Sequence, residues 1–119
     1  MEYSIKIEKI NQFLEHSQKE LQRYNSTKKL IYLQQSAEKT YGAYTLLLEF
    51  IIKKEIYSHI EIRRISDKLS KKDKDFAKLF RNSENLHAFF YEGRVYDKIV
   101  INMIQESNKI IRKILNKNV

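Results

Sequence analysis

Arg81 and His87 are the two residues whose types and spacing could carry chemistry, with five residues between them in the stretch LFRNSENLHAFFYEG, residues 79–93. An arginine keeps its positive charge at physiological pH and binds phosphate through several N–H donors. A histidine gains or loses a proton near neutral pH. The two side chains together could bind a phosphate and move a proton beside it, so we predict them as catalytic residues.

A carboxylate, a phenol and two amides lie near this pair if the stretch is helical, with about 100° between successive residues. Residues three and four apart are neighbours on a helix, which puts Glu84 and Tyr91 beside His87. We therefore predict four supporting residues, namely Asn82, Glu84, Asn85 and Tyr91.

The spacing of Arg81 and His87 is a weak signal on its own, because chains rich in lysine and arginine contain it by chance. A histidine on a helix flank usually caps the edge of a core or faces water. An arginine opposite the core is usually solvated. A purely structural role for both residues therefore stays open beside the catalytic one.

The composition of the 119 residues favours an all-α protein. The chain has no proline and two glycines, although turns and sheets depend on both. Long charged and apolar side chains dominate, and these favour helices. A chain of this length can bury a core as one domain. We expect residues 1–119 to form a single-domain bundle of about five helices.

Several absences bear on location and cofactors. The chain has no cysteine, so neither disulfides nor thiol chemistry is expected. It has no apolar run of membrane-spanning length, and its start lacks a signal pattern, so we expect a cytoplasmic protein without a membrane partner. It has no glycine-rich phosphate loop, and its histidines lack metal-ligand spacing, so we predict no metal and no cofactor.

The net charge of +8, from 23 basic and 15 acidic residues, favours polyanionic partners such as RNA. The bases concentrate between Lys53 and Arg81, but acids are interspersed among them. A solvated helix surface is the simpler interpretation of this stretch.

Apolar periodicity and capping signals divide the chain into helices. Ser58 with Glu61 forms a capping box, and Ser70 with Asp73 repeats the pattern. Gly93 suits a left-handed C-terminal cap. We expect helices over about 3–24, 28–57, 58–69, 70–92 and 95–115.

The first expected helix has an apolar seam with alternating steps of three and four residues, from Tyr3 to Tyr24. We favour contact with the core of the same chain, and contact with a second copy is the alternative. Gly42 could let another helix approach closely, including a helix across a dimer. His16 and His59 are expected to face water.

Aromatic side chains gather after His87. Phe89, Phe90, Tyr91 and Tyr96 could stack on bases. At helical spacing such residues are more often part of the core. We expect the inward face of this helix to consist of Phe76, Leu79, Leu86 and Phe90.

Three segments resemble the archaeal PaREP proteins, small helical members of the HEPN (higher eukaryotes and prokaryotes nucleotide-binding) superfamily. They are QQSAEKTYGAYTLLLEF, YSHIEIRRISDKL and LFRNSENLHAFFYEG, within residues 34–93. An AEK-x-aromatic-GA element runs from Ala37 to Ala43, and an LH-x-x-FYE element runs from Leu86 to Glu92.

The resemblance implies a HEPN-like helical bundle that forms a homodimer and, as in many HEPN proteins, a metal-independent endoribonuclease. Arg81, followed by the polar Asn82, and His87 match its arginine–histidine motif. The implied reaction is attack of an RNA 2′-hydroxyl on the adjacent phosphate. His87 would transfer a proton and Arg81 would stabilise the charge of the phosphorane. One protomer supplies too few groups for both proton transfers, so two motifs would pair in the dimer.

The chain departs from the toxin-type members of the superfamily at one position. They have a tyrosine two residues after the histidine, where this chain has Phe89, and its own tyrosine follows at Tyr91. Other HEPN domains are non-catalytic and bind nucleotides, RNA or proteins, so a helical adaptor is the alternative function. A toxin of a defence or toxin–antitoxin pair would have a nucleotidyltransferase-like partner protein.

Overall fold

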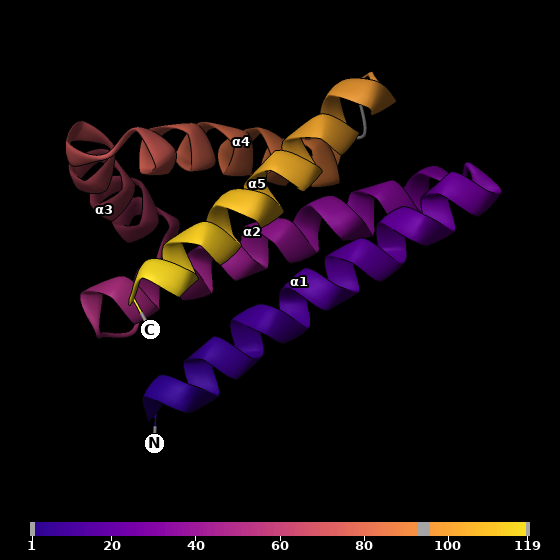
Figure 1. Cartoon of the computed structure of the whole chain (residues 1–119). Helices are drawn as coiled ribbons and strands as arrows, with labels where there is room; N and C mark the ends of the chain where they lie inside the picture. The colour runs from indigo at the N-terminus through magenta and orange to yellow at the C-terminus, as the bar shows by residue number, and fades with distance from the viewer. Residues whose placement is uncertain (1, 93–95, 119) are drawn as a thin grey trace.

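Five α-helices and no strand make up the described part of the chain in a computed structural model, which confirms the expected all-α fold (Figure 1). The structure describes the backbone of residues 2–92 and 96–118, and the side chains of residues 5–90 and 96–118. The helices are α1 (Glu2–Thr27), α2 (Leu30–Ile52), α3 (His59–Lys72), α4 (Lys74–Glu92) and α5 (Asp97–Asn118).

Helix α2 occupies the centre of the bundle and contacts each of the other four helices. It forms a long antiparallel hairpin with α1, and α5 and α4 pack on its other sides (Figure 1). Helix α3 sits at one end, mainly against α4. The central place of α2 agrees with its sequence, because a helix that is apolar around most of its circumference must be covered on several sides.

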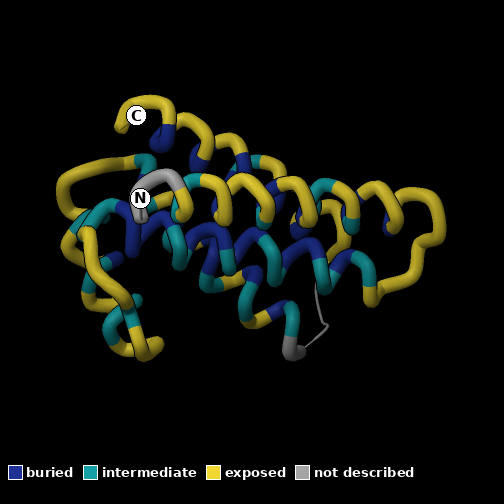
Figure 2. The backbone as a smooth tube through the Cα atoms, turned by 90° about the horizontal axis from the view of Figure 1, so that it is seen from below, coloured by how far each residue is buried: buried dark blue, intermediate teal, exposed yellow. Residues whose placement is uncertain are grey.

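The seam of α1 faces the core of its own chain, as the favoured interpretation holds. Ile10, Leu14, Leu21 and Tyr24 are all buried against neighbouring helices, and the exposed residues of α1 lie on the opposite side (Figure 2). This seam therefore belongs to the packing of a single chain.

Gly42 leaves room on α2 for the ring of Phe13 from α1. A Cβ atom added at Gly42 would lie 2.6 Å from Cε1 of Phe13, well inside van der Waals contact. The space at Gly42 is therefore used by a side chain of α1 in the same chain.

A layer of buried polar side chains divides the apolar core into two clusters. It is made of Ser17, Ser36, Thr40 and Asn108, each at most 1% exposed. The Thr40 hydroxyl donates to Asn108 Oδ1 at 2.8 Å, and the Asn108 amide donates to Ser17 Oγ at 3.2 Å. Ser17 and Thr40 are also bonded at 2.8 Å, so the network closes on itself. Because the members satisfy one another, their burial carries no unpaired donor or acceptor.

Helix α2 ends at Ile52 and not near Tyr57, where periodicity alone had predicted its end. Lys53 takes a left-handed conformation, and its N–H bonds to the carbonyl of Glu49. The Glu49 carboxylate then accepts the backbone N–H of Ile56 at 2.9 Å, which holds the connection to α3. The buried carboxylate of Glu49 makes this contact. The pattern of apolar residues contains no sign of it, so the pattern does not show where α2 ends.

Ser58 begins α3 as predicted, because its hydroxyl accepts the Glu61 N–H at 3.2 Å. The predicted boundary at Ser70 is wrong, since α3 continues to Lys72. Asp73 starts α4 instead, and its carboxylate accepts the N–H of Asp75 at 2.7 Å. Either residue could serve as an N-cap, and a carboxylate also interacts favourably with the positive end of the helix dipole.

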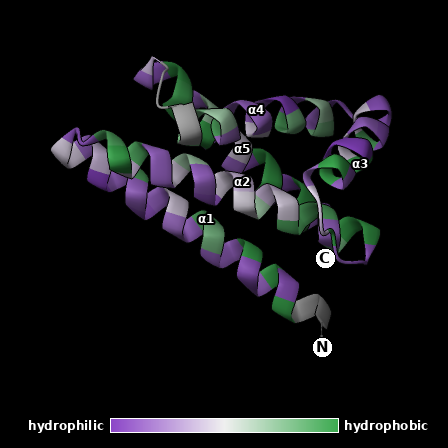
Figure 3. Ribbon diagram, turned by 180° about the vertical axis from the view of Figure 1, so that it is seen from behind, coloured by the Kyte–Doolittle hydropathy of each residue, from purple (hydrophilic) through white to green (hydrophobic). Residues whose placement is uncertain are grey.

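Helix α5 begins at Asp97, two residues after the predicted start, and continues past the predicted end at Leu115. The predicted cap at Gly93 lies outside the described residues. Hydrophobic and hydrophilic residues alternate around the helices (Figure 3). Among the described residues, no helix combines the length and the apolar character that crossing a membrane requires.

Candidate functional site

The inward face of α4 places His87 at the edge of the core. Phe76, Leu79, Leu86 and Phe89 are buried, while Phe90 is half-buried. The predicted inward face is thus confirmed for Phe76, Leu79 and Leu86, whereas Phe89 is buried more deeply than Phe90. Helix α4 packs against both α2 and α5. A larger part of its circumference is therefore buried than contact with one helix would bury. Phe89 lies on the α5 side of this buried part and joins an apolar cluster with residues of that helix.

Three aromatic rings from three helices stack beside this edge. His87 of α4 lies over Tyr41 of α2, with 4.2 Å between ring centroids and 17° between planes. His59, in the first turn of α3, lies 5.6 Å from His87 between ring centroids. The Tyr41 hydroxyl is 3.0 Å from His59 Nδ1. His59 is exposed, as predicted, and it also connects α3 to both other helices.

Two carboxylates complete the arrangement, and we call the six residues the histidine cluster: Glu38, Tyr41, His59, Arg63, Glu84 and His87. Glu38 Oε2 lies 3.4 Å from His87 Nδ1. Glu84 Oε1 lies 3.3 Å from His59 Nε2 and 3.7 Å from Arg63 Nε. Each imidazole thus has its own carboxylate partner.

The two ring nitrogens of His59 face different groups. Nε2 lies 3.3 Å from Glu84 Oε1, and Nδ1 lies 3.0 Å from the hydroxyl of Tyr41. The chain carboxylate–imidazole–phenol is the geometry in which an oriented base draws a proton from a hydroxyl group.

Burial also changes proton affinities in and beneath the cluster. Desolvation raises the pKa of Glu38, although the neighbouring His87 opposes this shift. Tyr44 lies beneath Glu84 with its ring fully buried and bonds to Ser66. Burial raises the pKa of Tyr44, and the charge of Glu84 adds to the effect. A carboxyl group with a raised pKa in a half-exposed site, as Glu38 is here, is often found at functional positions.

Arg81 lies on α4 near Glu106 of α5. It is exposed, and its charge contributes to lowering the pKa of Glu106 on α5, after hydrogen bonds from Asn82 and Lys78. Buried Asn82 donates to Glu106 at 2.8 Å, so it faces α5. At about 100° per residue, the six positions from Arg81 to His87 leave the two side chains about 120° apart around α4.

The remaining predicted supporting residues are Glu84, Asn85 and Tyr91. Glu84 joins the histidine cluster together with His87. Asn85 is exposed, and the side chain of Tyr91 lies outside the described residues.

Sequence reasoning missed four members of the cluster: Glu38, Tyr41, His59 and Arg63. Glu38 and Tyr41 stand in the AEK-x-aromatic-GA element, which was the available signal for them. His59 and Arg63 are one helical turn apart on α3, but nothing in the sequence says which helix they face. Within the residues the structure describes, no group of three or more histidines and carboxylates is arranged to hold a metal ion.

Comparison with known proteins gave one family. The model of the archaeal PaREP1/PaREP8 family matches residues 12–115. No curated protein and no solved structure matches the chain. The matched residues include the whole histidine cluster together with Arg81 and Asn82.

Proposed function

The chain belongs to the archaeal PaREP1/PaREP8 family, and we propose that it is a HEPN-like protein that cleaves RNA without a metal ion. The observation that carries the proposal is the pair of carboxylate-bound histidines, His59 and His87, with 5.6 Å between ring centroids. Cleavage through the 2′-hydroxyl needs one group to accept a proton and another to give one. Two imidazoles on one half-exposed surface suit both tasks.

Both imidazoles are accessible from solvent. The side chain of His87 is 27% exposed and that of His59 is 43% exposed. Glu38 contacts Nδ1 of His87 at 3.4 Å and so orients its ring. A base held by a third group in this way is the usual arrangement of a working acid–base catalyst.

In the proposed reaction, His87 accepts the proton of the RNA 2′-hydroxyl while the 2′-oxygen attacks phosphorus. The bond from phosphorus to the 5′-oxygen breaks, and the leaving oxygen takes a proton. That proton comes from His59 of the same chain or, in a homodimer, from the His87 of a second protomer. The products are a 2′,3′-cyclic phosphate and a 5′-hydroxyl.

Two arginines are candidates for stabilising the phosphorane charge. Arg81 matches the family motif, whereas Arg63 joins the cluster through Glu84. Arg81 is exposed, so in a homodimer it is also available to the cluster of a second protomer.

The test is incubation of the purified protein with mixed RNAs in excess chelator, followed by analysis of the product ends. We expect cyclic-phosphate ends and a rate that falls by about a hundredfold in His87→Gln. His16→Gln is the matched control, because His16 is exposed on α1 outside the cluster. Unchanged cleavage by folded His87→Gln protein would reject the catalytic role.

The same assay separates the two arginines. Arg63→Ala and Arg81→Ala are compared with Arg64→Ala, an exposed neighbour on α3 that serves as the control. Loss of a residue that stabilises transition-state charge should slow cleavage by roughly a hundredfold or more.

Non-catalytic binding of RNA, nucleotide or a partner protein is the second candidate, and the engagement of His59 favours it. Both ring nitrogens of His59 already have partners, so a proton transfer from it must break a contact. A labelled RNA that the wild-type protein binds and leaves uncut, with cyclic ends absent, would support this function over cleavage.

A further inference from the structure

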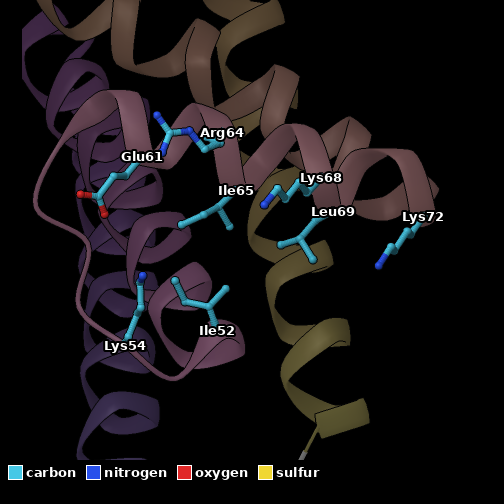
Figure 4. A pocket seen from close by; sticks show the side chains of 8 residues that line it. All are labelled: Ile52, Lys54, Glu61, Arg64, Ile65, Lys68, Leu69 and Lys72. Carbon is cyan, nitrogen blue, oxygen red and sulfur yellow. The ribbon is translucent and has the colours of Figure 1, made fainter.

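A groove of about 600 Å³ lies between the outer face of α3 and the end of α2 (Figure 4). Ile52 from the end of α2 points toward Ile65 and Leu69 of α3, and these three half-buried aliphatic side chains form its floor. The histidine cluster uses a different flank of α3, where His59 and Arg63 lie. The groove is therefore a separate surface.

Four exposed cations line this floor. Arg64, Lys68 and Lys72 follow one another at intervals of four residues along α3, and Lys54 stands opposite. Glu61 is the single acidic residue of the lining. None of the four cations forms an ion pair with another residue in the described part of the chain.

The stability of α3 accounts for only part of this row. Like charges four residues apart on a helix repel each other, and Arg64, Lys68 and Lys72 form two such pairs. Glu61, three residues before Arg64, offsets the repulsion at that end of the row, and the helix dipole favours Lys72 in the last turn. Lys68 has neither advantage, so an acidic partner would relieve the repulsion that remains.

We propose that the groove binds an amphipathic helix of a partner protein, with apolar side chains on the floor and acidic side chains against the cations. The lining of α3 from Glu61 to Lys72 spans roughly 16 Å, enough for about three turns of a partner helix. Such a helix presents apolar residues at intervals of three and four between acidic flanks. Single-stranded nucleic acid is less suited, because it binds through aromatic stacking and the lining has no aromatic residue.

The probe is a labelled synthetic peptide of about 14 residues, with leucines at helical spacing and glutamates on both flanks. Fluorescence anisotropy measures its affinity for the full chain. We expect binding at least tenfold tighter than that of a scrambled peptide of the same composition. Replacing the leucines by serine should weaken binding to a similar degree, because the floor is apolar.

Charge reversal locates the site. Arg64→Glu with Lys68→Glu should weaken binding at least tenfold and should favour a peptide whose glutamates are replaced by lysine. Lys19→Glu with Lys98→Glu is the matched control, because it changes the net charge equally at exposed positions outside the groove. Equal binding of the ordered and scrambled peptides would overturn the proposal. So would displacement of the peptide by a single-stranded RNA whose own binding is lost in the groove variant.

Discussion

Tyr44 and Ser66 form a polar contact at the base of the histidine cluster. Both are fully buried, and each hydroxyl has the other as its partner. A buried polar group costs free energy when it loses its partner, but replacing both partners by apolar groups costs much less. The contact therefore fixes α2 to α3 at the place where Tyr41 and His59 must meet.

We expect Tyr44→Phe to lower the free energy of unfolding by about 1–3 kcal/mol, because Ser66 is left without a partner in the core. Adding Ser66→Ala should recover part of this loss, since no unpaired hydroxyl then remains. Urea unfolding of the two single variants and the double variant measures the coupling. Strictly additive effects would mean that the hydroxyl contact contributes nothing to stability.

His87 was singled out in the sequence because Arg81, its partner in the motif, is close along the chain. The two side chains point in different directions on α4, and the helical period does not say which neighbouring helix each one meets. Glu38 and His59 meet His87 from distant parts of the chain, and Glu38 stands 49 positions before His87. A helical period indicates which residues share a face, but it does not identify the helix that the face meets.

At the level of the helices, Gly42 makes room on α2 for the Phe13 ring of α1. Alanine is better than glycine inside a helix by about 1 kcal/mol. At this position a methyl group meets the ring of Phe13, and crowding a packed site costs about 1–3 kcal/mol. The clash therefore exceeds the gain in helix propensity.

We expect Gly42→Ala to lower the free energy of unfolding by about 1 kcal/mol in the wild-type background. In a Phe13→Ala background the sign should reverse, because the ring is gone and alanine contributes about 1 kcal/mol of helix propensity. Thermal or urea unfolding of the four proteins checks this. The same sign in both backgrounds would show that Phe13 does not limit the space at Gly42.

The number and order of the helices followed from apolar period and capping residues, and their ends followed less well. Ser58 was found because its cap lies within a local pattern. The early end of α2 depends on Glu49, whose side chain bonds to a residue seven positions later. Caps made by interior side chains follow from the fold, so a local pattern does not reveal them.

At the level of the whole molecule, the proposed homodimer has a direct consequence for kinetics. If the His87 of a second protomer gives the proton to the leaving oxygen, cleavage per molecule should rise with protein concentration until the dimer is saturated. If His59 of the same chain gives it, the rate per molecule should stay constant. Sedimentation and cleavage, measured together over roughly a hundredfold range of concentration, distinguish the two sources.

The polar layer in the core has a consequence for the register of the helices. A slip of α1 by one turn would bring Phe13 or Leu21 to the place of Ser17. Thr40 and Asn108 would then face an apolar side chain and lose hydrogen bonds in the interior, whereas the apolar seam would still find apolar neighbours. Helices that meet only through apolar side chains can shift their register at little cost in free energy, and a single buried polar contact can prevent such a shift. The layer thus selects one alignment of three helices from several that hydrophobic packing alone would accept.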